Sequence, residues 1–113
     1  MNQRQRQAFA AAMGEARQAY RQRHWQQAFA LLERAHVLGQ TRVVPHVQSH
    51  WWMLKVGWQR RDAREVRGQL LRLPAALLLS RLWVPVGNTG GANVSPVQPM
   101  PIAGDLRDLM ETD

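Results

Sequence analysis

The sequence predicts an all-α fold: a small antiparallel helical bundle of about four helices, with an extended Gly/Pro-rich C-terminal segment wrapping over it. Apolar residues recur at helical spacing through the first 83 residues, and no strand-like alternation interrupts them. The chain has 113 residues, 45% hydrophobic and 20% charged, which is typical of one globular domain. We expect the bundle over residues 1–83. Residues 84–113 should form an extended segment with a short terminal helix, packed on the same domain.

The first two helices are predicted from their apolar faces. The first runs from about Gln3 to Arg23 and carries apolar side chains at i, i+4, i+7 and i+11, namely Phe9, Met13, Ala16 and Tyr20. The second begins near Trp25 and should end at Gly39, because glycine is the usual residue just after a helix.

Two further helices follow after short connections. Pro45 fits the first turn of a third helix that runs to about Arg60. Asp62, followed three residues later by Glu65, resembles a capping arrangement for a fourth helix. Pro74 should kink or divide that helix. Its expected apolar face consists of Val66, Leu70, Leu73 and Leu77.

The character of the chain changes after Trp83. Residues 84–104 carry four prolines and four glycines, so they cannot form a regular helix. Their apolar side chains predict that the segment packs over the bundle. The stretch Gly87 to Ser95 lacks the ending of a phosphate-binding loop, so its glycines are expected to serve turns. Asp105 should cap a terminal helix from Leu106 to Glu111.

Composition excludes several classes of protein. The absence of cysteine rules out disulfides, thiol catalysis, cysteine zinc fingers and iron–sulfur clusters. The apolar stretch from Leu70 to Val86 is broken by Arg72, Pro74 and Arg81, and it is shorter than the roughly 20 residues of a spanning helix. The N-terminus has no apolar core of a signal peptide. We therefore expect a cytoplasmic protein without a transmembrane segment.

The net charge of +7 is unevenly distributed. Residues 1–81 hold fourteen of the fifteen basic side chains and four acidic ones, whereas residues 82–113 hold one basic and four acidic side chains. Such a basic body could bind an acidic partner or its own tail. Because the arginines are spread along every helix rather than gathered in one block, nucleic acid is an unlikely partner.

Three histidines and one glutamate form the constellation that points to chemistry. They occur as E-x-x-H followed by H-x-x-x-H across a helix–loop–helix: Glu33, His36, His46 and His50. His36 falls on the core side of its helix, and His46 and His50 share one face of the next. Burial of three imidazoles and a carboxylate without a shared partner is costly. We therefore expect His36, His46 and His50 to bind a metal, with Glu33 either as the fourth ligand or as a base beside the ligands. The alternative is a polar structural network.

The ligand types favour a divalent transition metal, with zinc first and iron, manganese, nickel or cobalt as alternatives. A ferritin-like di-iron site needs two E-x-x-H motifs and further carboxylates, so one metal ion per chain is simpler. A homodimer that brings two E-x-x-H motifs together remains possible. The site could also belong to a metalloenzyme, a hydrolase or oxidoreductase. A third alternative is a metal-free helical module that binds an acidic partner.

Three segments carry a resemblance to a known family: LLERAHVLGQ, VPHVQSHWWMLKVGWQRRD and VPVGNTGGANVSPVQPMPI. On these segments the chain resembles the small bacterial family DUF3703, a family of unknown function, over roughly residues 8–111. The family motif includes the elements that stand here as Glu33, His36, His46 and His50, together with the stretch Gly87 to Ser95. The resemblance implies no established activity. Family members often accompany heavy-metal resistance and cation-efflux genes, which implies a role in metal handling.

Overall fold

The computed structural model describes residues 1–80 and 82–111, and these residues form five helices and no strand. The all-helical prediction is therefore confirmed. The helices are α1 (Gln3–Arg21), α2 (Trp25–Gly39), α3 (Val43–Gln59), α4 (Ala63–Leu79) and α5 (Gly104–Met110).

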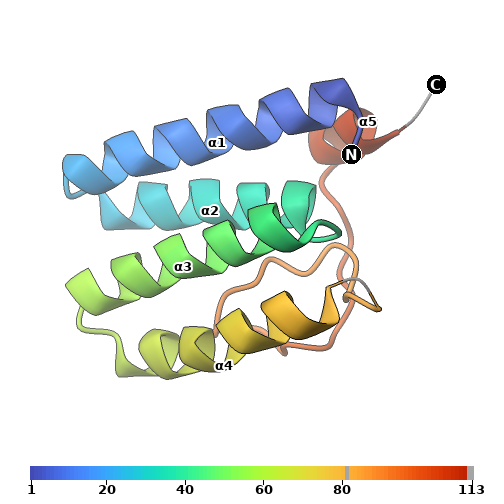
Figure 1. The fold of residues 1–113 in the computed structure, drawn as a ribbon. Coiled ribbons are helices and arrows are strands. Elements are labelled where there is room, and N and C mark those ends of the chain that lie inside the picture. Colours follow the sequence, from blue (N-terminus) through green and yellow to red (C-terminus); the bar gives the residue numbers. More distant parts are fainter. Residues whose placement is uncertain (81, 112–113) are drawn as a thin grey trace.

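Helices α1 to α4 lie side by side in the order of the chain (Figure 1). Helix α2 packs against both α1 and α3, and α4 packs against α3 alone among the described helices. The short α5 contacts α1 and α2 near the start of the chain (Figure 1). One face of α4 therefore has no described helix over it.

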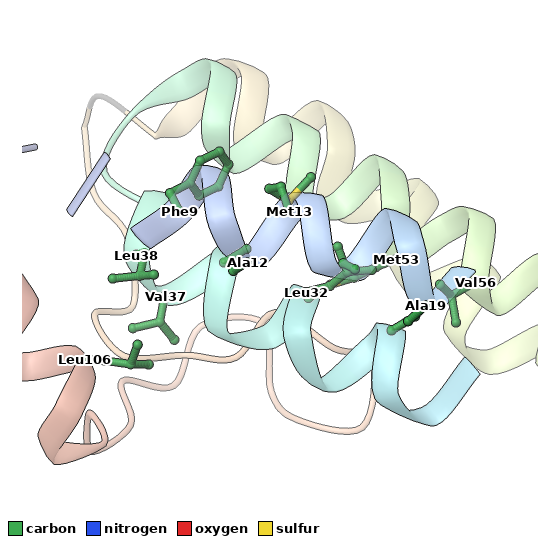
Figure 2. Close-up of a cluster of buried hydrophobic side chains, with 13 residues drawn as sticks. Phe9, Ala12, Met13, Ala19, Leu32, Val37, Leu38, Met53, Val56 and Leu106 are labelled. Atoms are coloured by element: carbon green, nitrogen blue, oxygen red, sulfur yellow. The ribbon is translucent and has the colours of Figure 1, made fainter. Parts of the chain in front are cut away.

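The hydrophobic core fills the space between α1, α2 and α3 (Figure 2). Leu32 and Met53 lie at its centre, where each side chain is at most 1% exposed. Small side chains on α1 and α2, such as Ala16 and Ala28, allow these two helices to approach closely. Leu106 of α5 joins the same cluster and attaches the end of the chain to the bundle (Figure 2).

Asp62 caps α4 as predicted, because its carboxylate accepts a hydrogen bond from the backbone N–H of Glu65 at 3.1 Å. The reciprocal half of a capping box is not formed. The N–H of Asp62 donates instead to the carbonyl oxygen of Gly57. The Glu65 side chain is thereby free to point into the protein, where it is buried.

The prediction that α4 packs through its apolar face is wrong, because a different face of the helix is buried. Leu70 and Leu77 are 55% and 60% exposed and Val66 and Leu73 are half-buried, whereas the buried residues of this helix are Glu65, Gln69 and Ala76. The helix turns its polar and small side chains inward because they complete hydrogen bonds around the buried histidines. Pro74 does not divide α4, which is one continuous helix across it.

The predicted cap of the terminal helix is also wrong. Helix α5 begins one residue before Asp105, and its N-cap is Ala103 without a side-chain hydrogen bond. The Asp105 carboxylate instead accepts from Nη2 of Arg34 on α2 at 2.8 Å. This ion pair is largely exposed, so it stabilises the protein little.

The segment between α4 and α5 makes hydrogen bonds to the helices. The Gln40 side chain, just after α2, donates to the carbonyl oxygen of Pro85 and accepts from the N–H of Gly87. Nη2 of Arg72 on α4 donates to the carbonyl oxygen of Val94 at 2.9 Å. None of the helices in the described part of the chain is long and apolar enough to cross a membrane.

Candidate metal centre

Three buried imidazole rings meet between α2 and α3. Nε2 of His36 lies 2.9 Å from Nε2 of His46 and 3.1 Å from Nε2 of His50, and the latter two are 3.1 Å apart. The three side chains are between 2% and 7% exposed. They are close enough to bind a single metal ion.

Local sequence explains how the rings are brought together. His36 belongs to the last turn of α2, and His46 to the first turns of α3, so the short connection between the helices places them near each other. His50 follows His46 by one helical turn on the same face of α3. The predictions that His36 lies on the core side of its helix and that His46 and His50 share one face of the next agree with this geometry.

Each ring is held by a hydrogen bond at its other nitrogen, Nδ1. Nδ1 of His36 is 2.8 Å from the carbonyl oxygen of Asn88, which can only accept. Nδ1 of His46 is 2.8 Å from Oγ of Ser80, and Nδ1 of His50 is 2.6 Å from Oε1 of Gln69.

The other hydrogen bonds of Ser80 and Gln69 show that both side chains accept a hydrogen bond from their histidine. Oγ of Ser80 donates its proton to the carbonyl oxygen of Ala76, so it accepts from His46. Nε2 of Gln69 donates to the Glu65 carboxylate at 2.6 Å and to the carbonyl oxygen of Gly90 at 2.9 Å, so its oxygen faces His50. All three histidines therefore carry their proton on Nδ1.

With the protons on Nδ1, the three Nε2 atoms present lone pairs to one another. Three acceptors at 2.9–3.1 Å repel unless a cation or a proton lies among them. A shared proton is disfavoured here. Burial lowers the pKa of His46 to about 4, and burial together with the neighbouring His46 lowers that of His50 to about 3. Burial also lowers the pKa of His36 well below its ordinary value. Three neutral imidazoles facing inward are the donor set that a transition-metal ion requires.

The spacing of the nitrogens fits a tetrahedral ion closely. Zinc–nitrogen bonds of about 2.0–2.1 Å in tetrahedral geometry separate the nitrogens by about 3.3 Å. The three Nε2 atoms need to move apart by only a few tenths of an ångström to reach that separation. Three ligands fill three of the four tetrahedral positions, so a fourth position is left for another group.

Glu33, the fourth residue of the predicted set, is not brought into this group. The ligand atoms within 4.8 Å of one another belong to the three histidines alone among the described residues. Glu33 instead lines a separate pocket with Gly57, which lies about two turns along α3 from His50. There burial raises the pKa of its carboxyl group. Glu33 therefore lies outside the group of ligand atoms.

The residues that hold the imidazoles were missed by the sequence argument. Gln69 comes from α4, Ser80 directly follows that helix, and Asn88 comes from the segment after it. Glu65 extends the network, because its carboxylate accepts from Gln69 and also from the N–H of Ala92. A signal was present: polar and small residues recur on one face of α4, at 65, 69, 72, 76 and 80.

Gly90 lies directly against the ring of His36. Its φ of +88° lies in the region that favours glycine, and a Cβ atom there would come within 2.6–2.8 Å of the imidazole. Its carbonyl oxygen accepts from Gln69. A glycine at this position therefore allows the segment to approach two members of the site at once. The expectation that the glycines only serve turns missed this contact.

A cavity of about 160 Å³ adjoins the three rings. Its walls come from α4 and from the segment after it, and Arg72 is among the lining residues. A group in the fourth position of an ion bound to the histidines could face this cavity.

Comparison with known proteins gives one match. No curated protein and no solved structure matches the chain. A family model described as protein of unknown function (DUF3703) matches residues 3–110, nearly the whole chain, and this range includes the three histidines, Gln69, Ser80 and Asn88. The chain belongs to the family DUF3703.

Proposed function

We propose that the protein binds one divalent transition-metal ion through the Nε2 atoms of His36, His46 and His50, and that it acts in metal handling or resistance. Zinc is the first choice, because tetrahedral nitrogen sites suit it well. Iron, manganese, nickel and cobalt are alternatives. Glu33 is left out of the ligand set because it lies outside the cluster.

A single observation carries this proposal: three buried Nε2 lone pairs face one another, and each ring has its Nδ1 proton engaged elsewhere. A polar network without metal would place a donor between such acceptors. Ordered partners for the far nitrogen are the usual way in which metal-ligating histidines are oriented. Asn88, Gln69 and Ser80 supply those partners.

The test is elemental analysis of untagged protein purified without chelators, beside the variant His50→Ala. We expect about one metal ion per chain in the parent protein and none in the variant. The matched control is His24→Ala, because His24 is exposed and lies outside the cluster. Equal metal content in all three proteins would overturn the assignment. Metal-free protein, even after incubation with zinc, iron, nickel and cobalt, would favour the metal-free interaction module instead.

The identity of the metal is tested separately by competition. Protein loaded with each ion in turn is titrated with a chelator of known affinity at constant pH. Affinities for a fixed nitrogen site follow the Irving–Williams order, with copper at the top. We expect zinc to bind more tightly than cobalt, iron and manganese. Retention of manganese over zinc would contradict a site built of three imidazoles.

A second candidate is a metalloenzyme that uses the same histidines. The cavity beside the cluster favours it, because catalytic zinc sites combine three protein ligands with an open position. A metal-bound water would then ionise near neutral pH. Cobalt-loaded protein whose visible spectrum titrates between about pH 6 and 8 would support this candidate. A spectrum that does not change with pH or with added anions would indicate a closed shell.

Several finer expectations belong to the same proposal. Neighbouring helices would run antiparallel, as their short connections require, and the segment from Val84 to Ile102 would close over the metal site. Its hydrogen bonds to His36, Gln69 and Arg72 support this closure.

A cytoplasmic location and a homodimer are further predictions. Sedimentation velocity measures whether the protein is a homodimer. In a homodimer we expect the exposed leucines of α4 to be buried in the interface.

A further inference from the structure

The cavity beside the histidines combines an apolar wall with a positive charge. Beyond the three rings, its lining is dominated by aliphatic groups that include Ala76 and Leu79 of α4 and Pro85 and Val97 of the following segment. Arg72 is the single charged residue among the described residues that line it. A bound divalent ion with three neutral ligands would add two further positive charges at one end.

Arg72 is held in place rather than extended into solvent. It is half-buried, and its Nη2 donates to the carbonyl oxygen of Val94. Its positive charge acts on both His36 and His50. A guanidinium has five N–H donors, so one hydrogen bond to a carbonyl leaves donors for a carboxylate.

The size of the cavity limits what it can hold. An apolar cavity of about 150 Å³ accommodates a molecule the size of benzene, and this one is about 160 Å³. A nucleotide or a sugar phosphate is larger than this volume and would extend out of the cavity. Phosphate and other strongly hydrated anions would also lose water against aliphatic walls without enough donors to replace it.

We propose that this cavity binds a small organic monocarboxylate whose carboxylate takes the fourth position on the metal, near Arg72, and whose apolar body, up to about the size of a benzene ring, packs against Leu79 and Val97. This inference rests on the proposed metal site. It assigns the class of ligand that the site would take.

The test uses cobalt-loaded full-length protein, with cobalt content measured before each titration. Benzoate, acetate and phosphate are added in turn, and the visible absorption of cobalt reports a change in its ligands. We expect saturable changes with both carboxylates, with benzoate binding at least about tenfold more tightly than acetate because its ring is buried. Phosphate should bind more weakly than benzoate.

Variants separate the contribution of the Arg72 charge to carboxylate binding from that of the apolar cavity wall. Arg72→Gln should weaken both carboxylates by about tenfold, and Arg72→Lys should restore most of the binding. Arg67→Gln on the same helix is the control, because Arg67 is exposed and does not line the cavity. Leu79→Ser should reduce the preference for benzoate over acetate. Cobalt content should stay at one per chain in all four variants.

Failure of this inference can be told from failure of the metal site. Protein that binds no cobalt overturns the proposed function itself. If the protein holds one cobalt ion but its spectrum does not change when carboxylates are added, only the ligand assignment is overturned. The same holds if acetate and benzoate bind equally, if phosphate binds most tightly, or if Arg72→Gln changes nothing.

Discussion

Nδ1 of His50 donates to Oε1 of Gln69 at 2.6 Å, and both side chains are buried. The Gln69 amide is itself oriented by the Glu65 carboxylate and by the carbonyl oxygen of Gly90. A buried carboxylate on α4 thus sets the tautomer of an imidazole on α3 through one amide. This relationship explains why a polar glutamine is fully buried on a helix whose leucines are exposed.

Substitution of Gln69 should weaken metal binding without removing a ligand. We expect Gln69→Leu to lower zinc affinity by about 10–100-fold, because the tautomer of His50 is then no longer fixed. Competition with a chelator measures the loss. Gln59→Leu, at an exposed position of α3, is the control. Equal affinities for the two variants would show that the amide does not orient the ring.

Gly90 should tolerate no side chain. Gly90→Ala is expected to lower the free energy of unfolding by about 1–3 kcal/mol, because alanine is strained at positive φ and its Cβ would displace His36. Zinc affinity should fall with it. Chemical denaturation of the zinc-loaded and metal-free forms measures both effects.

Gly104 provides the comparison for that substitution. A Cβ atom at Gly104 would meet nothing within 4 Å, and Gly104 is the first residue of α5. Gly104→Ala should therefore leave stability and zinc affinity close to those of the parent. A similar loss in both variants would mean that the approach of Gly90 to His36 is not what the site depends on.

Glu33 should be dispensable for metal binding. Glu33→Gln is expected to retain one metal ion per chain, whereas His46→Ala should lose it, because Glu33 lies outside the cluster of ligand atoms. Elemental analysis after dialysis measures both variants. Loss of metal from Glu33→Gln would restore Glu33 to the ligand set and contradict the register of α2 and α3.

The metal-free protein should lose stability as the pH falls from 7 to 5. The pKa values of the three buried histidines lie below their ordinary value of 6.5, at about 4 for His46 and about 3 for His50. In this window the unfolded chain binds protons that the folded chain excludes, so unfolding is favoured as pH decreases. Each group contributes a slope of at most about 1.4 kcal/mol per pH unit.

Urea denaturation of the metal-free protein at several pH values measures this slope. The control variant is His24→Ala, because His24 is exposed and lies outside the cluster. His50→Gln, with one buried titrating group fewer, should show a shallower slope. A free energy of unfolding that stays constant or rises as the pH falls from 7 to 5 would contradict neutral, buried imidazoles.

Local patterns were sufficient to predict the helices. Apolar periodicity located α1 to α3 within a few residues, and Asp62 was identified as the start of α4. The histidine pair at i and i+4 placed His46 and His50 on one face because helical geometry alone requires it. The division of the chain after residue 83 stays a prediction.

The remaining features depend on how elements meet. Leucines on α4 predicted a buried face, but α3 is the only one of the described helices that packs against α4, and the buried side of α4 satisfies the imidazoles instead. Glu33 was placed in the site because the alignment of α2 against α3 cannot be read from a single sequence. Asn88 contributes a backbone carbonyl, a group that every residue carries, so no side-chain pattern marks it.

The most direct test is the position of the metal itself. Crystals of zinc-loaded protein, measured at wavelengths on both sides of the zinc absorption edge, locate the ion by anomalous scattering. We predict one peak per chain, about 2.0–2.1 Å from Nε2 of His36, His46 and His50. A peak elsewhere, or three histidines in contact with no peak among them, would contradict the proposed centre.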